Sequence, residues 1–352
     1  MKASSEFRSR SVRILAIGGG TGLSTILRGL KQYVARSRQE RARLPISDLA
    51  AMVTVTDDGG SSGRLRREYS VLPPGDIRNC LVALSKDEAL LSRLFQYRFP
   101  GARALGGHSF GNLFLTALTR VTGDFPEAVR VSSQVLATRG RIFPSTAQNV
   151  TLEAELESGR RVRGETRISR SRSRIRRVYL APRRVRPLPE ILAAIREADL
   201  ILFGPGSLYT SIIPNLLVDG VAAAIARARA TRIYIANLMT QPGETEGYSV
   251  ADHVRAVYDH TRPGLFDWAI VNRAPVSPRL LRRYRHQGAE PVVCDTGELE
   301  KLGLDVLCSD FLLQDHVVRH DTDRLARAII RRFASRAPVG RNPATVGKTS
   351  RA

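Results

Sequence analysis

Several residue types are scarce in this 352-residue chain, and each shortage excludes a class of protein. The three cysteines, Cys80, Cys294 and Cys308, are too few and too irregularly spaced for a disulfide framework, and no CxxC or histidine partner indicates a structural zinc. No apolar run approaches the length of a membrane-spanning helix, and residues 1–12 lack the apolar centre of a signal peptide. We therefore expect a cytoplasmic protein with no membrane insertion.

Lysine is also scarce: it occurs at only five positions, so arginine supplies nearly all of the net charge of +22. Such a charge favours non-specific polyanion binding at low salt. However, the arginines are spread over the whole sequence, and no RNA-binding signature with interleaved aromatic residues accompanies their one dense cluster at 160–186. We expect a solvated arginine-rich face there, with a docking surface as the alternative, and no specific nucleic-acid partner.

What is present is an alternation of strand and helix patterns. Residues 12–17 form an apolar run that ends in a glycine turn, and apolar residues recur at helical spacing from Leu23 onward. The expected strands are 12–17, 49–56, 200–203, 232–236, 268–271 and 291–293, and the expected helices are 77–84, with Asp76 as its N-cap, 113–121, 125–136, 191–195, 218–228, 250–258, 280–284 and 322–333. This order predicts an α/β, Rossmann-like, doubly wound and mainly parallel sheet.

The pattern changes in the middle of the chain. Residues 149–156 and 162–179 alternate apolar and polar side chains around a Glu-Ser-Gly turn, which predicts an inserted antiparallel β subregion at about 148–181. The expected organisation is a disordered basic tail 1–11, a single Rossmann-like domain 12–336 and a disordered tail 337–352.

The strand patterns end in loops rich in small polar residues, and ligands of an open parallel sheet bind at the carboxyl ends of its strands. The first loop is Gly18-Gly19-Gly20-Thr21-Gly22, where the following helix would offer free N–H groups to a phosphate. No Gly-Lys-Ser/Thr follows, so the loop is not a P-loop. Phosphate or nucleotide binding is the favoured interpretation, and a plain packing turn is the alternative.

The second loop carries two adjacent acids, Asp57 and Asp58, followed by a Gly-Gly-Ser-Ser-Gly run that includes Ser61 and Ser62. Carboxylates beside phosphate oxygens can bind Mg²⁺, and they can equally hydrogen-bond a base or a sugar. The glycine and serine backbone lets a phosphate approach closely. All four residues are candidate ligand contacts and the two acids are metal candidates, with a turn or cap role for Asp58 as the alternative.

The third loop, Gly-Gly-His-Ser-Phe-Gly-Asn, opens a helix and contains His108, Ser109 and Asn112. These side chains could present donors to a phosphate at the positive end of the helix. A lone histidine is more often a hydrogen-bonding residue than a general acid. We therefore predict ligand binding here and no catalytic role.

Two further loops follow later strand patterns. Gly204, Gly206 and Ser207 belong to a Gly-Pro-Gly-Ser turn, which suits an anion at a strand-to-helix junction. Asn237 and Thr240 lie after the next strand and could read the polar edges of a ligand. A packing role could explain any one of these loops, but it explains five such loops at strand ends less well.

Clear motifs of covalent catalysis are few. The sequence has no HExxH and no convincing Cys/His pair, so no catalytic residue is predicted and ligand binding without turnover is favoured. Positioning and Mg²⁺ can catalyse phosphoryl transfer without a protein nucleophile. A metal-dependent phospho-transferase is therefore the alternative.

Together the motifs resemble the bacterial gluconeogenesis factor family, the YvcK-type proteins related to 2-phospho-L-lactate transferase (CofD). The resemblance rests on GGGTG at 18–22, TVTDDGGSSGRLR at 54–66, PGDIRNCLVAL at 74–84, GHSFGNLFL at 107–115, GPGSLYTSIIPNLLV at 204–218, NLMTQPGET at 237–245 and DH at 252–253. It extends from about Arg13 to Phe333.

The resemblance implies a regulator that binds UDP-sugars such as UDP-N-acetylglucosamine and links central carbon metabolism to cell-wall synthesis and cell shape. It also implies partners in cell-wall synthesis or a protein kinase, and it is compatible with a homodimer. Tyr284 and Arg319 match positions at which the family contacts the nucleotide sugar. The related transferase holds a nucleotide and a metal with a glycine loop and strand-end acids, which this chain shares.

Overall fold

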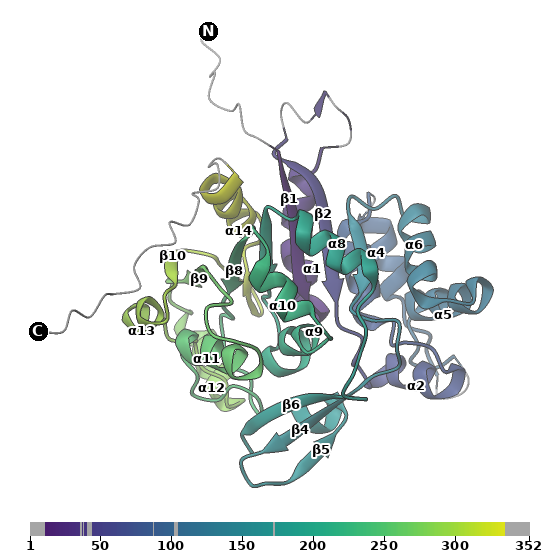
Figure 1. Cartoon of the computed structure of the whole chain (residues 1–352). Helices are drawn as coiled ribbons and strands as arrows, with labels where there is room; N and C mark the ends of the chain where they lie inside the picture. Colours follow the sequence, from purple (N-terminus) through teal and green to yellow (C-terminus); the bar gives the residue numbers. More distant parts are fainter. Residues whose placement is uncertain are drawn as a thin grey trace, which may run out of the picture.

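The central sheet is formed by seven strands in the order β10-β9-β8-β7-β1-β2-β3, and every neighbouring pair is parallel (Figure 1). The structure is a computed structural model that describes residues 11–334 except 36, 38, 41–43, 87, 102–104 and 172. The strands are β1 Val12–Gly18, β2 Ile46–Val53, β3 Arg141–Pro144, β7 Leu200–Phe203, β8 Thr231–Ile235, β9 Trp268–Asn272 and β10 Asp305–Ser309. This arrangement confirms the expected Rossmann-like fold. The predicted tails, 1–11 and 337–352, lie outside the described residues, apart from residue 11.

Helices cover both faces of the sheet. On one face α1 packs between α3 and α14, and on the other α8 packs beside α10 (Figure 1). The helices are α1 Gly20–Leu30, α2 Gly60–Tyr69, α3 Gly75–Leu84, α4 Glu88–Gln96, α5 Phe110–Thr122, α6 Phe125–Val135, α8 Pro189–Glu197, α9 Ile213–Leu216, α10 Val221–Arg227, α11 Val250–His260, α12 Pro278–His286, α13 Thr296–Lys301 and α14 Thr322–Ile329.

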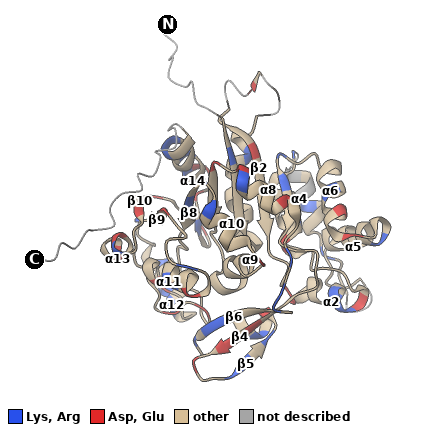
Figure 2. Ribbon diagram, in the orientation of Figure 1, with Lys and Arg blue, Asp and Glu red and all other residues tan. Residues whose placement is uncertain are grey.

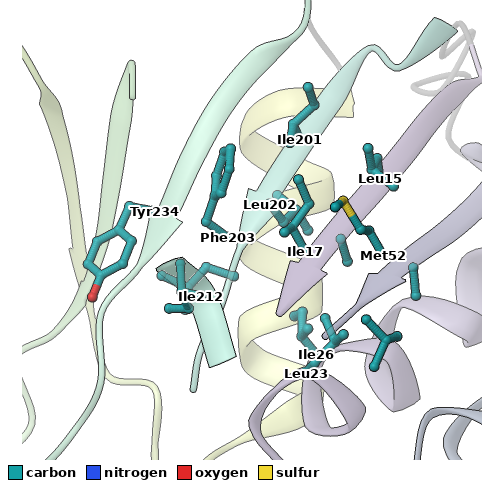
Figure 3. Packing of buried hydrophobic residues seen from close by; sticks show 14 of the residues in the cluster. Leu15, Ile17, Leu23, Ile26, Met52, Ile201, Leu202, Phe203, Ile212 and Tyr234 are labelled. Atoms are coloured by element: carbon teal, nitrogen blue, oxygen red, sulfur yellow. The ribbon is translucent and has the colours of Figure 1, made fainter. Parts of the chain in front are cut away.

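The core lies between the middle strands and α1. Ile17 on β1 lies in register with Met52 on β2 and Phe203 on β7, and Leu23 and Ile26 of α1 belong to the same buried cluster (Figure 3). All five side chains are fully buried, and burying such a side chain stabilises the fold by about 2 kcal/mol. The middle strands are nearly continuous apolar runs because helices cover them on both sides.

The strand order fixes where the sheet can bind a ligand. The chain starts at β1, continues to β2 and β3 on one side, and returns to β7 on the other side of β1. The connections after β1 and β7 therefore leave in opposite directions. A crevice forms at the carboxyl ends of the strands at such a switch point.

The predicted insertion is present between β3 and α8. Strands β4 Thr151–Leu156, β5 Arg161–Arg163 and β6 Ile175–Ala181 form an antiparallel sheet in the order β5-β4-β6, with the short helix α7 Glu165–Ser169 between β5 and β6. Its arginines are interleaved with acids, as Figure 2 shows: Arg163 lies 3.7 Å from Glu153, and Arg176 lies 2.9 Å from Glu155.

Several local predictions need correction. Strand β2 runs from 46 to 53 rather than 49 to 56, because its first residues pair with the start of β1. Residues 291–293 are no strand of the sheet, since Pro291 and Val293 make only isolated bridges. Asp76 is not an N-cap: it lies in the first turn of α3, whose N-cap is Pro74.

One membrane-related finding concerns the described residues. No single helix among them has the length and apolar character needed to cross a bilayer. The helical segments Leu208–Leu216 and Val221–Arg227 have the required length and apolar composition only when taken together, and the pair is bent by 75°.

Candidate functional site

A cleft of about 990 Å³ opens where the sheet order reverses. Its lining comes from the N-terminal turn of α1, the loops after β7 and β8, helix α7 of the insertion, helix α12, and the hairpin formed by β11 Leu312–Gln314 and β12 Val318–His320. We refer to this space as the cleft. Its size falls in the range of pockets that enclose a small organic ligand.

The N-terminus of α1 faces the cleft without a side-chain cap. Gly19 is the N-cap residue and has no side chain to cap the helix, and in the first turn Gly20 N donates to the Asp76 carboxylate. The first N–H groups of a helix lack intrahelical partners and lie at the positive end of the dipole. Gly20 adopts a φ of +60°, which glycine tolerates best. A Cβ at Gly22 would lie 2.3 Å from the Pro205 carbonyl oxygen, so the glycine loop and the loop after β7 touch.

The loops after β7 and β8 are held together by side-chain hydrogen bonds. Asn237 Oδ1 accepts a bond of 3.0 Å from Gly206 N, and Asn237 Nδ2 donates one of 2.9 Å to Gly206 O. Ser207 Oγ donates to Glu244 at 2.9 Å. Burial raises the pKa of Glu244, and its serine and backbone donors partly offset this. These bonds fix the turn beside α1 in one shape.

Two further carboxyls, Asp76 and Glu165, line the cleft beside the α1 N-terminus. Burial and then the charge of Asp57 raise the pKa of Asp76 to about 7, although Gly20 N donates to it. The pKa of Glu165 is raised well above its usual value by burial, then by Asp76 and Asp57. Thr56 Oγ1 donates to Glu165 at 3.2 Å. The acids therefore repel one another, and a cation or a proton would relieve this repulsion.

The far wall of the cleft comes from α12 and the β11–β12 hairpin. The Tyr284 hydroxyl accepts a hydrogen bond of 3.1 Å from Val318 N, and Arg319 pairs with Asp315. His320 also lines this wall; burial lowers its pKa to about 4, so it is neutral at physiological pH. The structure thus brings Tyr284 and Arg319 to the same cleft as the glycine loop, although they lie far away in sequence.

A second group of predicted residues forms a separate cluster under α2 and α5. Ser61 Oγ and His108 Nδ1 share a hydrogen bond of 3.0 Å, and Asn112 Nδ2 donates to Ser61 Oγ at 3.0 Å and to Ser62 Oγ at 3.5 Å. Ser109 caps α5 by accepting from Asn112 N. Ser109 is completely buried, and the side chains of Ser61, Ser62, His108 and Asn112 are at most 5% exposed.

Arginines complete this cluster. Arg78 Nη1 donates to Ser109 Oγ at 2.6 Å and to Asn112 Oδ1 at 3.0 Å. Burial, and then the charge of Arg64, lower the pKa of His108. We call Ser61, Ser62, Arg78, His108, Ser109 and Asn112 the buried polar cluster. None of its residues lines the cleft, and its polar groups bond mainly to one another.

The predicted acid pair also lies outside the cleft lining. Asp58 Oδ1 accepts hydrogen bonds from Thr166 N at 2.9 Å and Thr166 Oγ1 at 2.7 Å, so it anchors α7 of the insertion. Asp57 Oδ1 accepts from Gly59 N at 2.8 Å. Within the described part of the chain, no three His, Cys, Asp or Glu side chains are placed to hold a metal ion. Asp57 and Asp58 as ligands of a Mg²⁺ ion that arrives with phosphates stay a prediction.

The structure divides the predicted residues between these places. The cleft contains ten of them: Gly19, Gly20, Thr21, Gly22, Gly206, Ser207, Asn237, Thr240, Tyr284 and Arg319. Gly204 is buried and is not part of the lining, since a Cβ there would lie 3.1 Å from Ile212. The prediction missed Asp76, Glu165 and Glu244. The sequence signalled Asp76 only as a helix-start acid, and gave no signal for the other two.

Comparison with known proteins places this geometry in a family. Residues 14–312 match the family described as "2-phospho-L-lactate transferase CofD". The chain is 48% identical to the "Gluconeogenesis factor" of Bacillus subtilis over 319 residues, which are 90% of this chain and 97% of that protein. It is 46% identical to the "Gluconeogenesis factor" of Halalkalibacterium halodurans over 318 residues, 90% of this chain and 95% of that one.

A solved structure agrees. A crystal structure of a UPF0052 family member from Bacillus halodurans superposes with a TM-score of 0.85 at 44% identity, covering 91% of this chain and 99% of that chain. The fold is therefore that of this group of proteins. The chain belongs to the CofD family and, within it, to the gluconeogenesis factor group.

Proposed function

We propose that this protein binds a nucleotide sugar of the UDP-N-acetylglucosamine type in the cleft and acts as a regulator rather than as a catalyst. Its proposed role is to link central carbon metabolism to cell-wall synthesis and cell shape in the bacterial cytoplasm. The proposed partners are cell-wall synthesis proteins or a protein kinase.

The observation that carries the proposal is the contact between two phosphate-friendly turns at the switch point. The uncapped N-terminus of α1 and the Gly206 turn lie against each other, with Gly22 and Pro205 in contact. Backbone N–H groups at a helix N-terminus bind phosphate oxygens. A ligand with a diphosphate group suits two adjacent turns of this kind.

The remaining lining suits a sugar and a base. Hydroxyls of Ser24, Thr25, Thr210 and Ser211 add to those of Thr21 and Ser207 in the cleft, and Gln241 and Asn237 offer amides. Tyr284 presents a ring for stacking and Arg319 a guanidinium for phosphate. No cysteine lines the cleft, and its histidine, His320, is held neutral by burial.

Isothermal titration calorimetry with UDP-N-acetylglucosamine tests the proposal, with and without Mg²⁺. We expect saturable binding at one site per chain, and ³¹P NMR of the same sample should show the ligand intact. UDP alone should bind more weakly, and N-acetylglucosamine alone should not bind, because the two turns recognise the diphosphate. Absence of binding, or breakdown of the ligand, would contradict the proposal.

A second function, Mg²⁺-dependent transfer of a phosphorus-containing group, is favoured by one observation. Asp76 and Glu165 line the cleft beside the α1 N-terminus, and Mg²⁺ is usually held by one or two carboxylates together with substrate phosphates. These acids therefore fit an ion that arrives with a nucleotide. Such an ion would neutralise phosphate charge, while Asp76 and Glu165 would hold it beside the helix.

The two functions differ in what happens to the nucleotide. Incubation with UDP-N-acetylglucosamine or a nucleotide that carries 2-phospho-L-lactate as donor, Mg²⁺ and a deazaflavin alcohol as acceptor would yield a new ³¹P signal if the protein is a transferase. Glu165→Gln should then abolish the signal. If the nucleotide stays intact under all these conditions, the transferase function is rejected and the binding function stands.

A further inference from the structure

Two of the three cysteine thiols lie close together at the edge of the main sheet, and they differ from the third in burial. Cys294 Sγ and Cys308 Sγ are 3.6 Å apart. Cys308 is on β10, where it pairs with Val271 of β9, and Cys294 lies in the segment just before α13. Both residues are half-buried, whereas Cys80 on α3 is fully buried.

We propose that Cys294 and Cys308 form a reversible oxidation site, in which a hydroperoxide converts the two thiols into an intramolecular disulfide. The sulfurs are already within van der Waals contact, and both are partly open to solvent. A small inward movement of one side chain would bring them to bonding distance. Such pairs in proteins without a disulfide framework are typically redox-responsive rather than structural.

The surroundings assign an order to the two thiols. Burial and then a hydrogen bond with Cys294 raise the pKa of Cys308 to about 11, so Cys308 stays protonated at physiological pH; either sulfur can donate in the contact between them. Thr296 Oγ1 lies 3.4 Å from Cys294 Sγ and is a second hydrogen-bonding group for it. Cys294 is therefore the sulfur that reacts first, and Cys308 is the resolving thiol.

The chemistry balances with the peroxide as the oxidant. The Cys294 sulfur attacks one peroxide oxygen, the O–O bond breaks, and the other oxygen leaves as water or an alcohol, which gives a sulfenic acid. The Cys308 sulfur then attacks the Cys294 sulfur, an S–S bond forms, and the hydroxyl leaves as water with the Cys308 proton. Two thiols are oxidised and one peroxide is reduced.

The crosslink would tie a wall of the cleft to the sheet. Residues just before Cys294 hold the loop after β8: Thr240 N donates to Glu290 O at 2.7 Å, and Val292 N donates to Leu238 O at 3.1 Å. On its other side, Asp295 Oδ1 accepts from Ala251 N at the start of α11. A disulfide would fasten this segment to β10 whether or not a ligand is bound.

Peptide mapping tests the proposal directly on the full chain. Trypsin cleaves after Arg285, Lys301 and Arg319, so the two cysteines fall in separate peptides, 286–301 and 302–319. After treatment with one to two equivalents of hydrogen peroxide, we expect these peptides joined in a non-reducing digest. We also expect a loss of about 2 Da in intact mass and recovery with dithiothreitol.

Matched variants sharpen the test. Cys294→Ser and Cys308→Ser should each abolish the linked peptide, and Cys80→Ser should leave it unchanged. In Cys308→Ser, Cys294 should progress to sulfinic acid, whereas Cys294→Ser should leave Cys308 reduced. Linkage to Cys80, linkage only between chains, or equal oxidation of the two single variants would overturn the proposal.

Thermal unfolding provides an independent readout. The disulfide would close a loop of 15 residues, from 294 to 308, and should raise the Tm of the oxidised protein by about 5 °C. Hydrogen exchange in residues 287–293 should slow. A lower Tm after oxidation would overturn the proposal, because the bond would then form only in a distorted chain.

Discussion

The cleft and the buried polar cluster are built from similar sequence motifs and use them in opposite ways. Both come from glycine-containing loops and contain hydroxyl residues and an asparagine. In the buried polar cluster, Ser109 caps α5 and Arg78 bonds to Ser109 and Asn112. In the cleft, α1 begins without a side-chain cap. In the buried polar cluster the cap is a serine side chain of the same helix, whereas at α1 the Asp76 carboxylate accepts from Gly20 N and the turn lines the cleft.

The difference teaches that composition identifies polar loops but not their partners. A buried polar group needs a hydrogen-bond partner, and either the protein or a ligand can provide it. The strand order decides which loops meet at the switch point, and only those can share a ligand. The two regions should therefore respond differently to mutation, the cleft through affinity and the buried polar cluster through stability.

The largest expected effect is that of a substitution at Gly22, which should change both folding stability and ligand affinity. In Gly22→Ala the new Cβ would meet the Pro205 carbonyl at 2.3 Å, which should cost about 3 kcal/mol of folding stability and lower UDP-N-acetylglucosamine affinity at least about 100-fold. Denaturant unfolding and calorimetry measure the two. Gly297→Ala is the control, because nothing lies within 4 Å of a Cβ there; similar behaviour of the two variants would contradict the close contact.

Asn112→Ala should separate stability from binding. The side chain is 1% exposed and bonds to Ser61, Ser62 and Arg78, so its removal leaves buried partners unpaired and should cost about 2 kcal/mol. Affinity for the ligand should change less than about twofold. A large loss of affinity in folded protein would show instead that the buried polar cluster binds ligand.

Arg319→Ala should give the reverse result. Loss of a charge-assisted contact to phosphate should reduce affinity about tenfold to thirtyfold. Stability should hardly change, because the pair with Asp315 is exposed. Arg324→Ala is the matched control: its partners are Asp310 and Asp321 and it lies outside the cleft lining. Equal affinities of the two variants would remove Arg319 from the proposed site.

The smallest expected effect is a pH dependence set by Asp76. Its pKa of about 7 means that the carboxyl gains charge as pH rises through 7, and a charged carboxylate opposes an anionic ligand. Affinity should fall about tenfold between pH 6 and pH 8. Asp76→Asn should flatten this profile, which calorimetry at several pH values would show; an unchanged slope would assign the titration to another group.

The same raised pKa has a consequence for folding. An acid with a raised pKa in the folded state destabilises that state as pH rises above its unfolded value near 4, and the penalty is complete above about 7. Asp76→Asn should therefore be more stable than the natural protein at pH 8 and lose this advantage at pH 4.

The parts of the fold with strong periodicity could be predicted from sequence. The apolar runs of β1 and β7 and the amphipathic helices α5 and α6 are visible because burial on fixed faces imposes their spacing. Helix α2 was missed, because its sequence GSSGRLRREY has little apolar periodicity. It packs through small residues instead, with Gly63 against the backbone of Asp58.

The candidate site was predictable only in part, for a related reason. The sequence indicates which loops follow strands, but it does not give the distances between these loops in the fold. Glu165 is nearly one hundred residues from its neighbour Asp76 and comes from the insertion, which no local pattern places over a strand end. The Cys294–Cys308 contact was equally invisible, since the spacing of the two residues fits no motif.

Helix α7 gives the inserted sheet a part in recognition. It supplies Glu165 and Ser169 to the cleft, and Asp58 holds its first turn. The insertion is therefore not a detachable module: exchanging residues 151–181 between two relatives would transplant a portion of ligand selectivity together with the sheet. Under the proposed function, this segment sets part of what the cleft recognises, while the strands and glycine turns beneath it hold the diphosphate.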